Sequence, residues 1–107
     1  MTVNELLNYG FIAVSLPDPN REITGVYIGD LLSWVMGRAN SGDAWITIMS
    51  NENILAVASL ADTACIITAE GVELSESVKS TAEEKGINIL SFGGSAYEAA
   101  VKLYGLI

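Results

Sequence analysis

The sequence predicts a compact single α/β domain over residues 1–107, with a mostly parallel sheet of about four to five strands flanked by helices. Short apolar runs alternate with helical periodicities along the chain, and successive runs are too far apart for hairpins. Connections of that length are crossover helices, which give parallel strands. Half of the residues are apolar and 17% are charged, which is the composition of a globular domain.

The N-terminal part of the chain predicts a short helix, a strand and a loop. A capping-box spacing that starts at Thr2 and a stop signal at Gly10 predict a helix over residues 3–9. Residues 11–14 form an apolar run typical of a strand. Two prolines make residues 16–21 a loop, and this is the one segment that we expect to be mobile.

The next stretch predicts a strand that leads directly into a helix. Residues 25–28 are the strand, and Asp30 is predicted to open the helix. At 100° per residue, one broad apolar stripe of this helix is expected to face the core: Leu31, Leu32, Val35, Met36 and Ala39. Trp34 points away from that stripe, between Asp30 and Arg38.

The remaining chain predicts three further pairs of strand and helix. The strands are predicted at 44–49, 64–68 and 87–90, and the helices at 52–61, 75–85 and 95–105. The run 64–68 is the most uniformly apolar and is predicted to be central in the sheet. Ser75 and Ser95 are the predicted N-caps, and Glu98 completes a capping box. Helix 52–61 is apolar on nearly every side, so either the core or a second subunit must cover it on more than one side.

The charge of the chain excludes several classes of partner. Thirteen acids against five scattered bases give a net charge of −8, which disfavours nucleic acid and anionic membrane as partners.

No apolar run reaches the roughly 18 residues of a membrane span, and the N-terminus lacks the basic region of a signal peptide. A single cysteine excludes an internal disulfide, so we expect a cytoplasmic protein.

The chain contains no recognisable catalytic or metal-binding constellation. It has no histidine, and Cys65 lies among apolar strand residues, where a buried inert thiol is favoured over a nucleophile. The acids fit caps and turns better than a hard-cation site. We therefore predict no enzyme activity, no catalytic residues, no metal site and no required cofactor. An enzyme acting through Asp30 or Ser95 is the least supported alternative.

Ligands of parallel sheets bind beyond the carboxyl ends of the strands, where helix N-termini present free N–H groups. Three predicted loops lie at that edge, and their candidate ligand-binding residues are Ser50, Asn51, Gly71, Phe92, Gly93, Gly94 and Ser95. The favoured loop is the one around Gly93 and Gly94, for a nucleotide or a small anion. The alternative is that these glycines only serve the turn and that Ser95 is a plain cap.

Several stretches of the chain also resemble a known family. They are Gly25–Met36, Trp45–Ile48, Asn53–Leu60, Ile66–Thr68 and Ser95–Glu98. With these stretches the chain resembles the small stand-alone proteins of the DRTGG domain family, and the resemblance covers nearly the whole chain. The nearest counterpart of the pentapeptide that names the family is Arg21–Gly25. The resemblance implies a compact accessory α/β domain with a regulatory or dimerising role, and it transfers no functional residue.

Two functions follow from these observations as expectations. The first is a non-enzymatic regulatory or ligand-sensing module that acts as a homodimer. Trp34, with Asp30 and Arg38 beside it, is the candidate interface, although packing of Trp34 against the loop 16–21 stays open. The alternative is an adaptor that docks on an enzyme or regulatory protein through Trp34 and has no small ligand.

Overall fold

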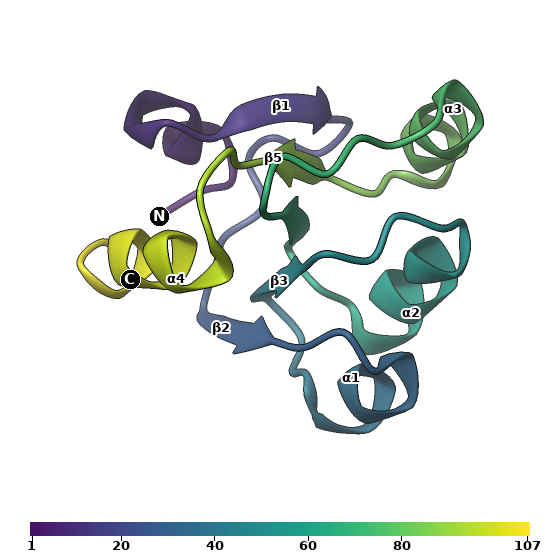
Figure 1. Cartoon of the computed structure of the whole chain (residues 1–107), viewed down its shortest axis with the longest axis horizontal. Helices are drawn as coiled ribbons and strands as arrows, with labels where there is room; N and C mark the ends of the chain where they lie inside the picture. The colour runs from purple at the N-terminus through teal and green to yellow at the C-terminus, as the bar shows by residue number, and fades with distance from the viewer.

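The centre of the molecule is a five-stranded sheet with the strand order β1-β5-β4-β3-β2 (Figure 1). The structure is a computed structural model that describes all 107 residues. The strands are β1 (Ile12–Ser15), β2 (Gly25–Ile28), β3 (Asp43–Thr47), β4 (Cys65–Thr68) and β5 (Ile89–Ser91). Strands β2 to β5 run parallel, and β1 pairs antiparallel with β5. The predicted fold class is therefore confirmed.

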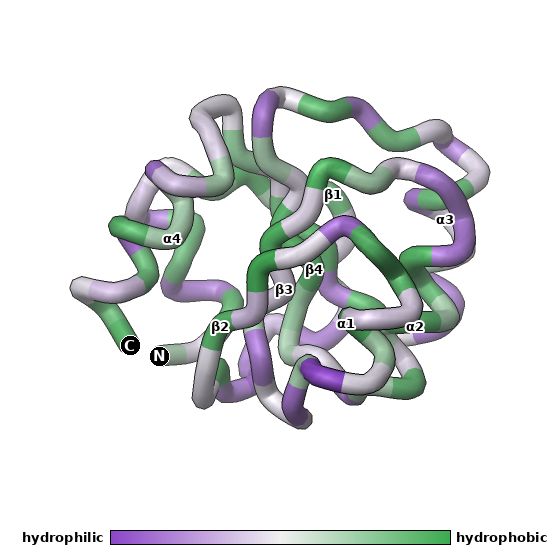
Figure 2. The backbone as a smooth tube through the Cα atoms, turned by 60° about the horizontal axis from the view of Figure 1, so that its bottom comes forward, coloured by the Kyte–Doolittle hydropathy of each residue, from purple (hydrophilic) through white to green (hydrophobic).

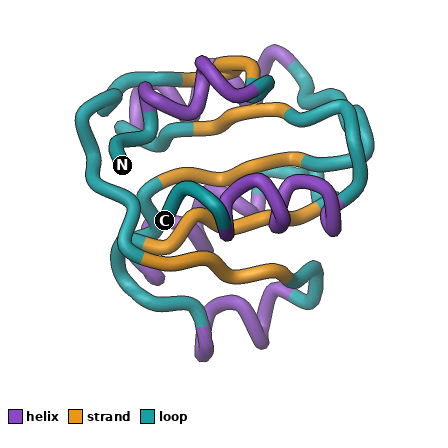
Figure 3. The backbone as a smooth tube through the Cα atoms, turned by 90° about the vertical axis from the view of Figure 1, so that its left-hand side faces the viewer, coloured by secondary structure: helices purple, strands orange, loops and turns teal.

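The helices form one layer on each face of this sheet. They are the 3₁₀ helix η1 (Asn4–Tyr9), α1 (Leu32–Arg38), α2 (Asn53–Ala61), α3 (Glu76–Lys85) and α4 (Ala96–Tyr104). Strands β2 to β5 follow one another in both the sequence and the sheet, so right-handed crossovers place α1, α2 and α3 on the same face. The other face is left to η1 and α4, and Figure 3 shows α4 lying in front of the strands and running along them.

Two apolar clusters fill the space between the sheet and these layers. The cluster under η1 and α4 contains Leu6, Phe11, Ile46, Cys65, Ile67, Leu90 and Leu103, among others. The cluster under α1, α2 and α3 contains Val35, Trp45, Ile54, Leu55, Ile66, Val78 and Ile89, among others. Every residue of β4 is buried, which confirms that this strand is central, and Figure 2 shows the apolar strands in the middle of the molecule.

The N-terminal helix forms where it is predicted but is a 3₁₀ helix. The carboxylate of Glu5 accepts hydrogen bonds from both the N–H and the hydroxyl of Thr2, at 3.1 and 3.0 Å. No helical N–H donates to the threonine hydroxyl, and Val3 occupies the N-cap position, so the predicted reciprocal capping box is absent. Gly10 ends the helix with φ at 90°, as its position predicts.

Two expectations for α1 are wrong. Leu31 and Met36, predicted to face the core, are 60% and 47% exposed, while Val35 is fully buried. The helix has only seven residues and lies under the edge of the sheet, so the core reaches a narrower stripe than the sequence pattern suggests. Asp30 does not cap the helix either, because Leu31 occupies the N-cap position without a side-chain bond.

The apolar helix α2 is covered on part of its circumference. Ile54, Leu55, Val57 and Ala58 are buried against the sheet and its neighbours, and α1 packs alongside. Leu60 on the outer side is 70% exposed. The chain by itself therefore leaves the outer side of α2 open.

The loop predicted to be mobile is held by hydrogen bonds. The N–H of Asp18 donates to Oδ1 of Asn88 at 3.0 Å, and Nδ2 of Asn88 donates back to the carbonyl of Asp18 at 2.7 Å. At the end of the loop, the Arg21 guanidinium pairs with the Asp62 carboxylate at 3.0 Å. These contacts tie the loop to the amino ends of the parallel strands.

Candidate functional site

The structure brings two of the three predicted ligand loops together. The N–H of Glu70 donates to the carbonyl of Gly94 at 2.8 Å, and the N–H of Gly71 donates to the carbonyl of Phe92 at 3.2 Å. The loops after β4 and β5 are thus joined through their backbones. These two N–H groups, which a bound anion would need, are already used within the protein.

The residues of the glycine loop mostly serve the loop itself. The ring of Phe92 is buried and stacks on Phe11 with the centroids 4.9 Å apart. A side chain at Gly94 would meet that ring, whereas Gly93 faces open space. Ser95 caps α4 in a reciprocal capping box with Glu98. Among Phe92, Gly93, Gly94 and Ser95, Gly93 is therefore the residue most accessible to a ligand.

The third predicted loop, at Ser50 and Asn51, shares no hydrogen bond with these two and has a local role. Oδ1 of Asn51 accepts the N–H of Asn53 at 2.9 Å and so supports the start of α2. Ser50 is exposed at the end of β3.

The candidate interface residues also have defined neighbours. The Asp30 carboxylate accepts the Thr47 hydroxyl at 2.8 Å and the Ile48 N–H at 2.9 Å, so it ties the β2–α1 turn to the end of β3. Trp34 is 55% exposed, and the Arg38 guanidinium lies 4.0 Å from the centre of its ring. Trp34 thus stays at the surface in a cation–π pair with Arg38.

A row of three hydroxyl residues crosses the carboxyl edge of the parallel strands. Thr47, Thr68 and Ser91 are in register on β3, β4 and β5, on the face covered by α1, α2 and α3. The hydroxyl of Thr47 donates to Asp30, and that of Thr68 donates to the Leu90 carbonyl at 3.4 Å. The Ser91 hydroxyl has no hydrogen-bond partner in the protein and is partly exposed. Ser91 therefore offers a free donor and acceptor at this edge.

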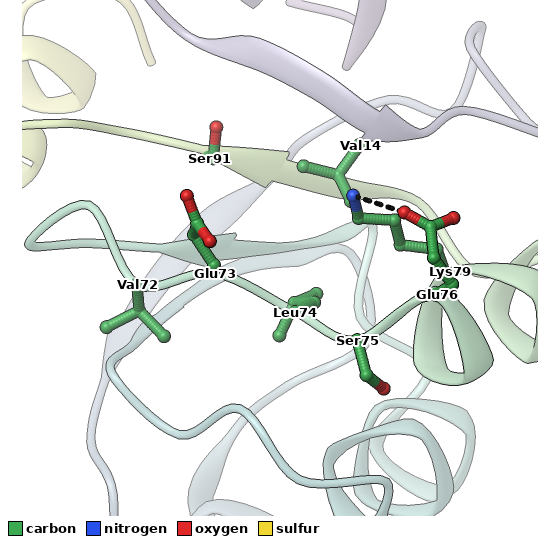
Figure 4. A pocket seen from close by; sticks show the side chains of 8 residues that line it. All are labelled: Val14, Val72, Glu73, Leu74, Ser75, Glu76, Lys79 and Ser91. Carbon is green, nitrogen blue, oxygen red and sulfur yellow. Dashed lines mark hydrogen bonds and ion pairs between the residues drawn. The ribbon is translucent and has the colours of Figure 1, made fainter.

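A cavity of about 480 Å³ opens beside Ser91 (Figure 4). It lies between the ends of β1 and β5, the segment that leads into α3, and the first turns of α3. The lining residues are Val14, Val72, Glu73, Leu74, Ser75, Glu76, Lys79 and Ser91. Its size falls in the range of small-molecule sites, and its place at the carboxyl edge of a parallel sheet is where such sites occur.

The polar groups of this cavity have mixed charge. Lys79 is the single cation, and its ammonium lies 3.3 Å from the Glu76 carboxylate in an exposed ion pair, seen as a dashed line in Figure 4. Such surface pairs contribute about 0–1 kcal/mol, so Lys79 is readily available to another anion. Glu73 adds a second carboxylate. The Ser75 hydroxyl oxygen accepts the Val78 N–H at 3.2 Å and so caps α3.

The cavity lies at the edge of the sheet that sequence reasoning selected, but none of its lining residues is among the predicted ligand-binding residues. Ser75 is recognisable from sequence only as a cap. Ser75 and Lys79 are four residues apart at the start of a helix that follows a strand, which places them on one face near that edge. That spacing, together with Ser91 at the end of the neighbouring strand, is the signal from which the cavity could have been anticipated.

The rest of the chain offers no obvious reactive group. Complete burial raises the pKa of the Cys65 thiol to about 12, so the thiolate is negligible near neutral pH. No group of three or more cysteine and acidic side chains has the geometry to hold a metal ion. No helix has both the length and the apolar character required to cross a bilayer.

Comparison with known protein families identifies the family of this chain. A model of the DRTGG domain matches residues 18–106, which is more than four fifths of the chain. The chain belongs to the DRTGG domain family. The resemblance found in its sequence is therefore confirmed, and this DRTGG domain begins within the loop that precedes β2.

A solved structure of similar fold comes from a regulatory protein region. It is the crystal structure of the CBS and DRTGG domains of the regulatory region of Clostridium perfringens pyrophosphatase, complexed with the activator diadenosine tetraphosphate. The TM-score is 0.69 at 16% sequence identity, over 91% of this chain. The chain spans 43% of the length of that structure. Comparison with curated proteins gives no match.

Proposed function

We propose that this DRTGG domain is a non-enzymatic regulatory module that senses a small ligand and acts as a homodimer. The observation that carries the ligand part is the cavity at the carboxyl edge of the sheet, with the unpaired Ser91 hydroxyl on its wall. The family match supports a regulatory role, because a DRTGG domain occurs in the regulatory region of the pyrophosphatase.

The lining of the cavity favours a nucleoside-like ligand. Val14, Val72 and Leu74 supply apolar surface for a planar base. The Ser91 hydroxyl and the Glu73 carboxylate suit the hydroxyls of a sugar, since a carboxylate accepts hydrogen bonds. Lys79 supplies one positive charge, but Glu73 and Glu76 oppose a free phosphate ion. A ligand that combines a base and a sugar with few phosphates fits these groups best.

Thermal unfolding in the presence of adenine compounds tests this proposal. Adenosine, AMP, ATP and diadenosine tetraphosphate are the probes, and inorganic phosphate is the comparison. A ligand at 100 times its dissociation constant stabilises the native state by about 2.7 kcal/mol, which raises Tm by roughly 10 °C or more in a domain of this size. No change in Tm with any adenine compound at millimolar concentration would contradict the proposal.

A matched pair of lysine variants locates the site. Lys79→Glu reverses the cation of the cavity, while Lys85→Glu makes the same change in net charge at the far end of α3, outside the cavity. We expect the shift in Tm caused by AMP to fall in Lys79→Glu and to persist in Lys85→Glu. Equal shifts in the two variants would place the ligand elsewhere.

A matched pair of serine variants tests the free hydroxyl. Ser91→Ala removes it, and Ser80→Ala removes a hydroxyl from the exposed side of α3. Only Ser91→Ala is expected to weaken the binding of adenosine, since each lost hydrogen bond contributes about 1 kcal/mol. An unchanged affinity in Ser91→Ala would count against the proposed contact with the sugar.

The second candidate function is an adaptor that docks on an enzyme or another regulatory protein. It is favoured by Trp34, which is 55% exposed although tryptophan is typical of binding hot spots. In this case Trp34→Glu abolishes capture of a stable partner, while Tyr9→Glu, at another exposed aromatic residue, does not. A partner retained equally by the two variants would exclude Trp34 as the docking residue.

A further inference from the structure

An apolar groove lies between the edge strand β2 and helix α4. Its volume is about 400 Å³, and all five lining residues are apolar or aromatic: Val26, Tyr27, Ile28, Ala100 and Tyr104. It is separate from the ligand cavity, with which it shares no residue.

The groove exists because α4 covers the outermost strand incompletely. Val26 and Ile28 are in register with Ala44 and Ile46 of β3, which belong to the cluster under α4. They point to the same face, yet they remain 37% and 51% exposed. The sheet therefore ends in an apolar strip that the chain covers only in part.

Helix α4 continues this apolar strip on its outer side. Tyr97, Val101 and Tyr104 are four and three residues apart, so they form one stripe on the helix. They are 77%, 54% and 89% exposed, whereas the core-facing Ala99 and Leu103 are fully buried. We call the combined area the β2–α4 surface, and it comprises Val26, Ile28, Tyr97, Ala100, Val101 and Tyr104.

The two edges of the sheet differ in how they resist pairing. The β1 edge has an irregular register between Ala13 and Ser15, which disturbs pairing with a further strand. The β2 edge has a regular register over Gly25 to Ile28 and contains neither lysine nor proline. In proteins that stay monomeric, edge strands are usually protected by lysine, by proline or by a bulge. The β2 edge has none of these features and is open to pairing with a strand of another chain.

We propose that two copies of this chain associate through their β2–α4 surfaces, with the two β2 strands antiparallel about a twofold axis. A twofold contact must be self-complementary, and this surface carries both a groove and two protruding tyrosine rings. The chain has a net charge of −8, but none of the six residues is charged, so the surface itself brings no like charges together. This inference rests on the proposed homodimer and specifies its surface.

The size of the surface reaches the minimum for a specific, reversible dimer. A fully buried tyrosine removes about 150–250 Å² from water, so Tyr97 and Tyr104 contribute roughly 300 Å². With the half-exposed aliphatic residues, each copy buries roughly 500 Å², and the pair on the order of 1,000 Å², which is the lower bound of a specific interface.

Sedimentation of the full chain over a range of micromolar concentrations tests the surface, with Ile28→Lys and Tyr104→Lys as variants. Each dimer then has two lysines facing apolar residues, and the dissociation constant is expected to rise by about 100-fold or more, since every 1.4 kcal/mol is a factor of ten. Ile12→Lys is the matched control, because Ile12 is a 64% exposed isoleucine on the opposite edge strand. It is expected to leave the dimer unchanged.

The possible outcomes distinguish a failure of the proposed surface from a failure of the proposed homodimer. A wild-type monomer at every concentration overturns both, while the ligand experiments still test the sensing role. A wild-type dimer that persists in Ile28→Lys and Tyr104→Lys overturns the surface alone, and its loss in Trp34→Ala would move the interface to α1. If Ile28→Lys fails to fold, Tyr104→Lys decides, because the side chain of Tyr104 is 89% exposed.

Discussion

Asn88 is the buried polar side chain whose removal should lower the free energy of unfolding most. It is 3% exposed and lies just before β5. Its amide nitrogen donates to the carbonyls of Asp18 and Ala64, at 2.7 and 3.0 Å, and its oxygen accepts the Asp18 N–H. One side chain thus joins the loop before β2, the start of β4 and the start of β5.

The magnitude follows from these three contacts. Each intramolecular hydrogen bond contributes about 1 kcal/mol net, and a buried carbonyl left without a partner costs about 1–3 kcal/mol. Asn88→Ala should therefore lower the free energy of unfolding by about 3 kcal/mol. For a domain of this length, that corresponds to a fall in Tm of roughly 10–20 °C.

Urea unfolding of Asn88→Ala beside Asn51→Ala measures this cost. Asn51 is exposed and makes one local bond, to the Asn53 N–H, so its loss should cost about 0.5–1 kcal/mol. Hydrogen exchange gives an independent readout, because the Asp18 amide should lose protection selectively in Asn88→Ala. Equal destabilisation by the two variants, or a protected Asp18 amide in Asn88→Ala, would refute the reasoning.

Two further predictions concern the glycine loop and the acid stability of the domain. Gly94→Ala should lower the free energy of unfolding in urea by about 1–3 kcal/mol, because the new Cβ would lie 2.8 Å from the buried Phe92 ring. Gly93→Ala should change this free energy by less than about 0.5 kcal/mol, since Gly93 faces open space. Equal losses in the two variants would be inconsistent with this packing. Hydrogen bonds, chiefly from Arg21, lower the pKa of Asp62, so its stabilising contribution is present above the unfolded-state pKa of about 4 and is lost as the pH falls through the lower folded value. Stability measured from about pH 5 to pH 3 should fall less steeply in Asp62→Asn than in the wild type, and parallel curves would contradict the assignment.

Local signals in the sequence predicted the individual elements well. Gly25–Ile28 is observed with the predicted bounds, and Ser75 and Ser95 cap their helices as predicted. These features depend on a few neighbouring residues, which the sequence displays directly. The strand order and the antiparallel pairing of β1 depend on contacts between distant segments, which a single sequence does not encode in any local pattern.

The sequence predicted how α1 is oriented but not how much of it is covered. Periodicity gives the direction of an apolar stripe, and Val35 lies at its buried centre. Leu31 and Met36 lie on its flanks, where coverage depends on the width of the neighbouring layer. The same limit applies to the candidate cavity, because the carboxyl-edge rule selects an edge, whereas the cavity itself depends on how α3 and β1 enclose it.

The ligand cavity and the β2–α4 surface lie at opposite ends of the strand order. The cavity is formed at β5 and β1, the surface at β2, and the buried strands β3 and β4 separate them. A ligand in the cavity would therefore touch no residue of the surface, and it would affect the proposed dimer only by favouring one of two arrangements of the domain. Because the two residue sets do not overlap, Lys79→Glu and Tyr104→Lys should act additively on stability in the absence of ligand. A change of the dimer constant on ligand binding would then measure the coupling between the two sites.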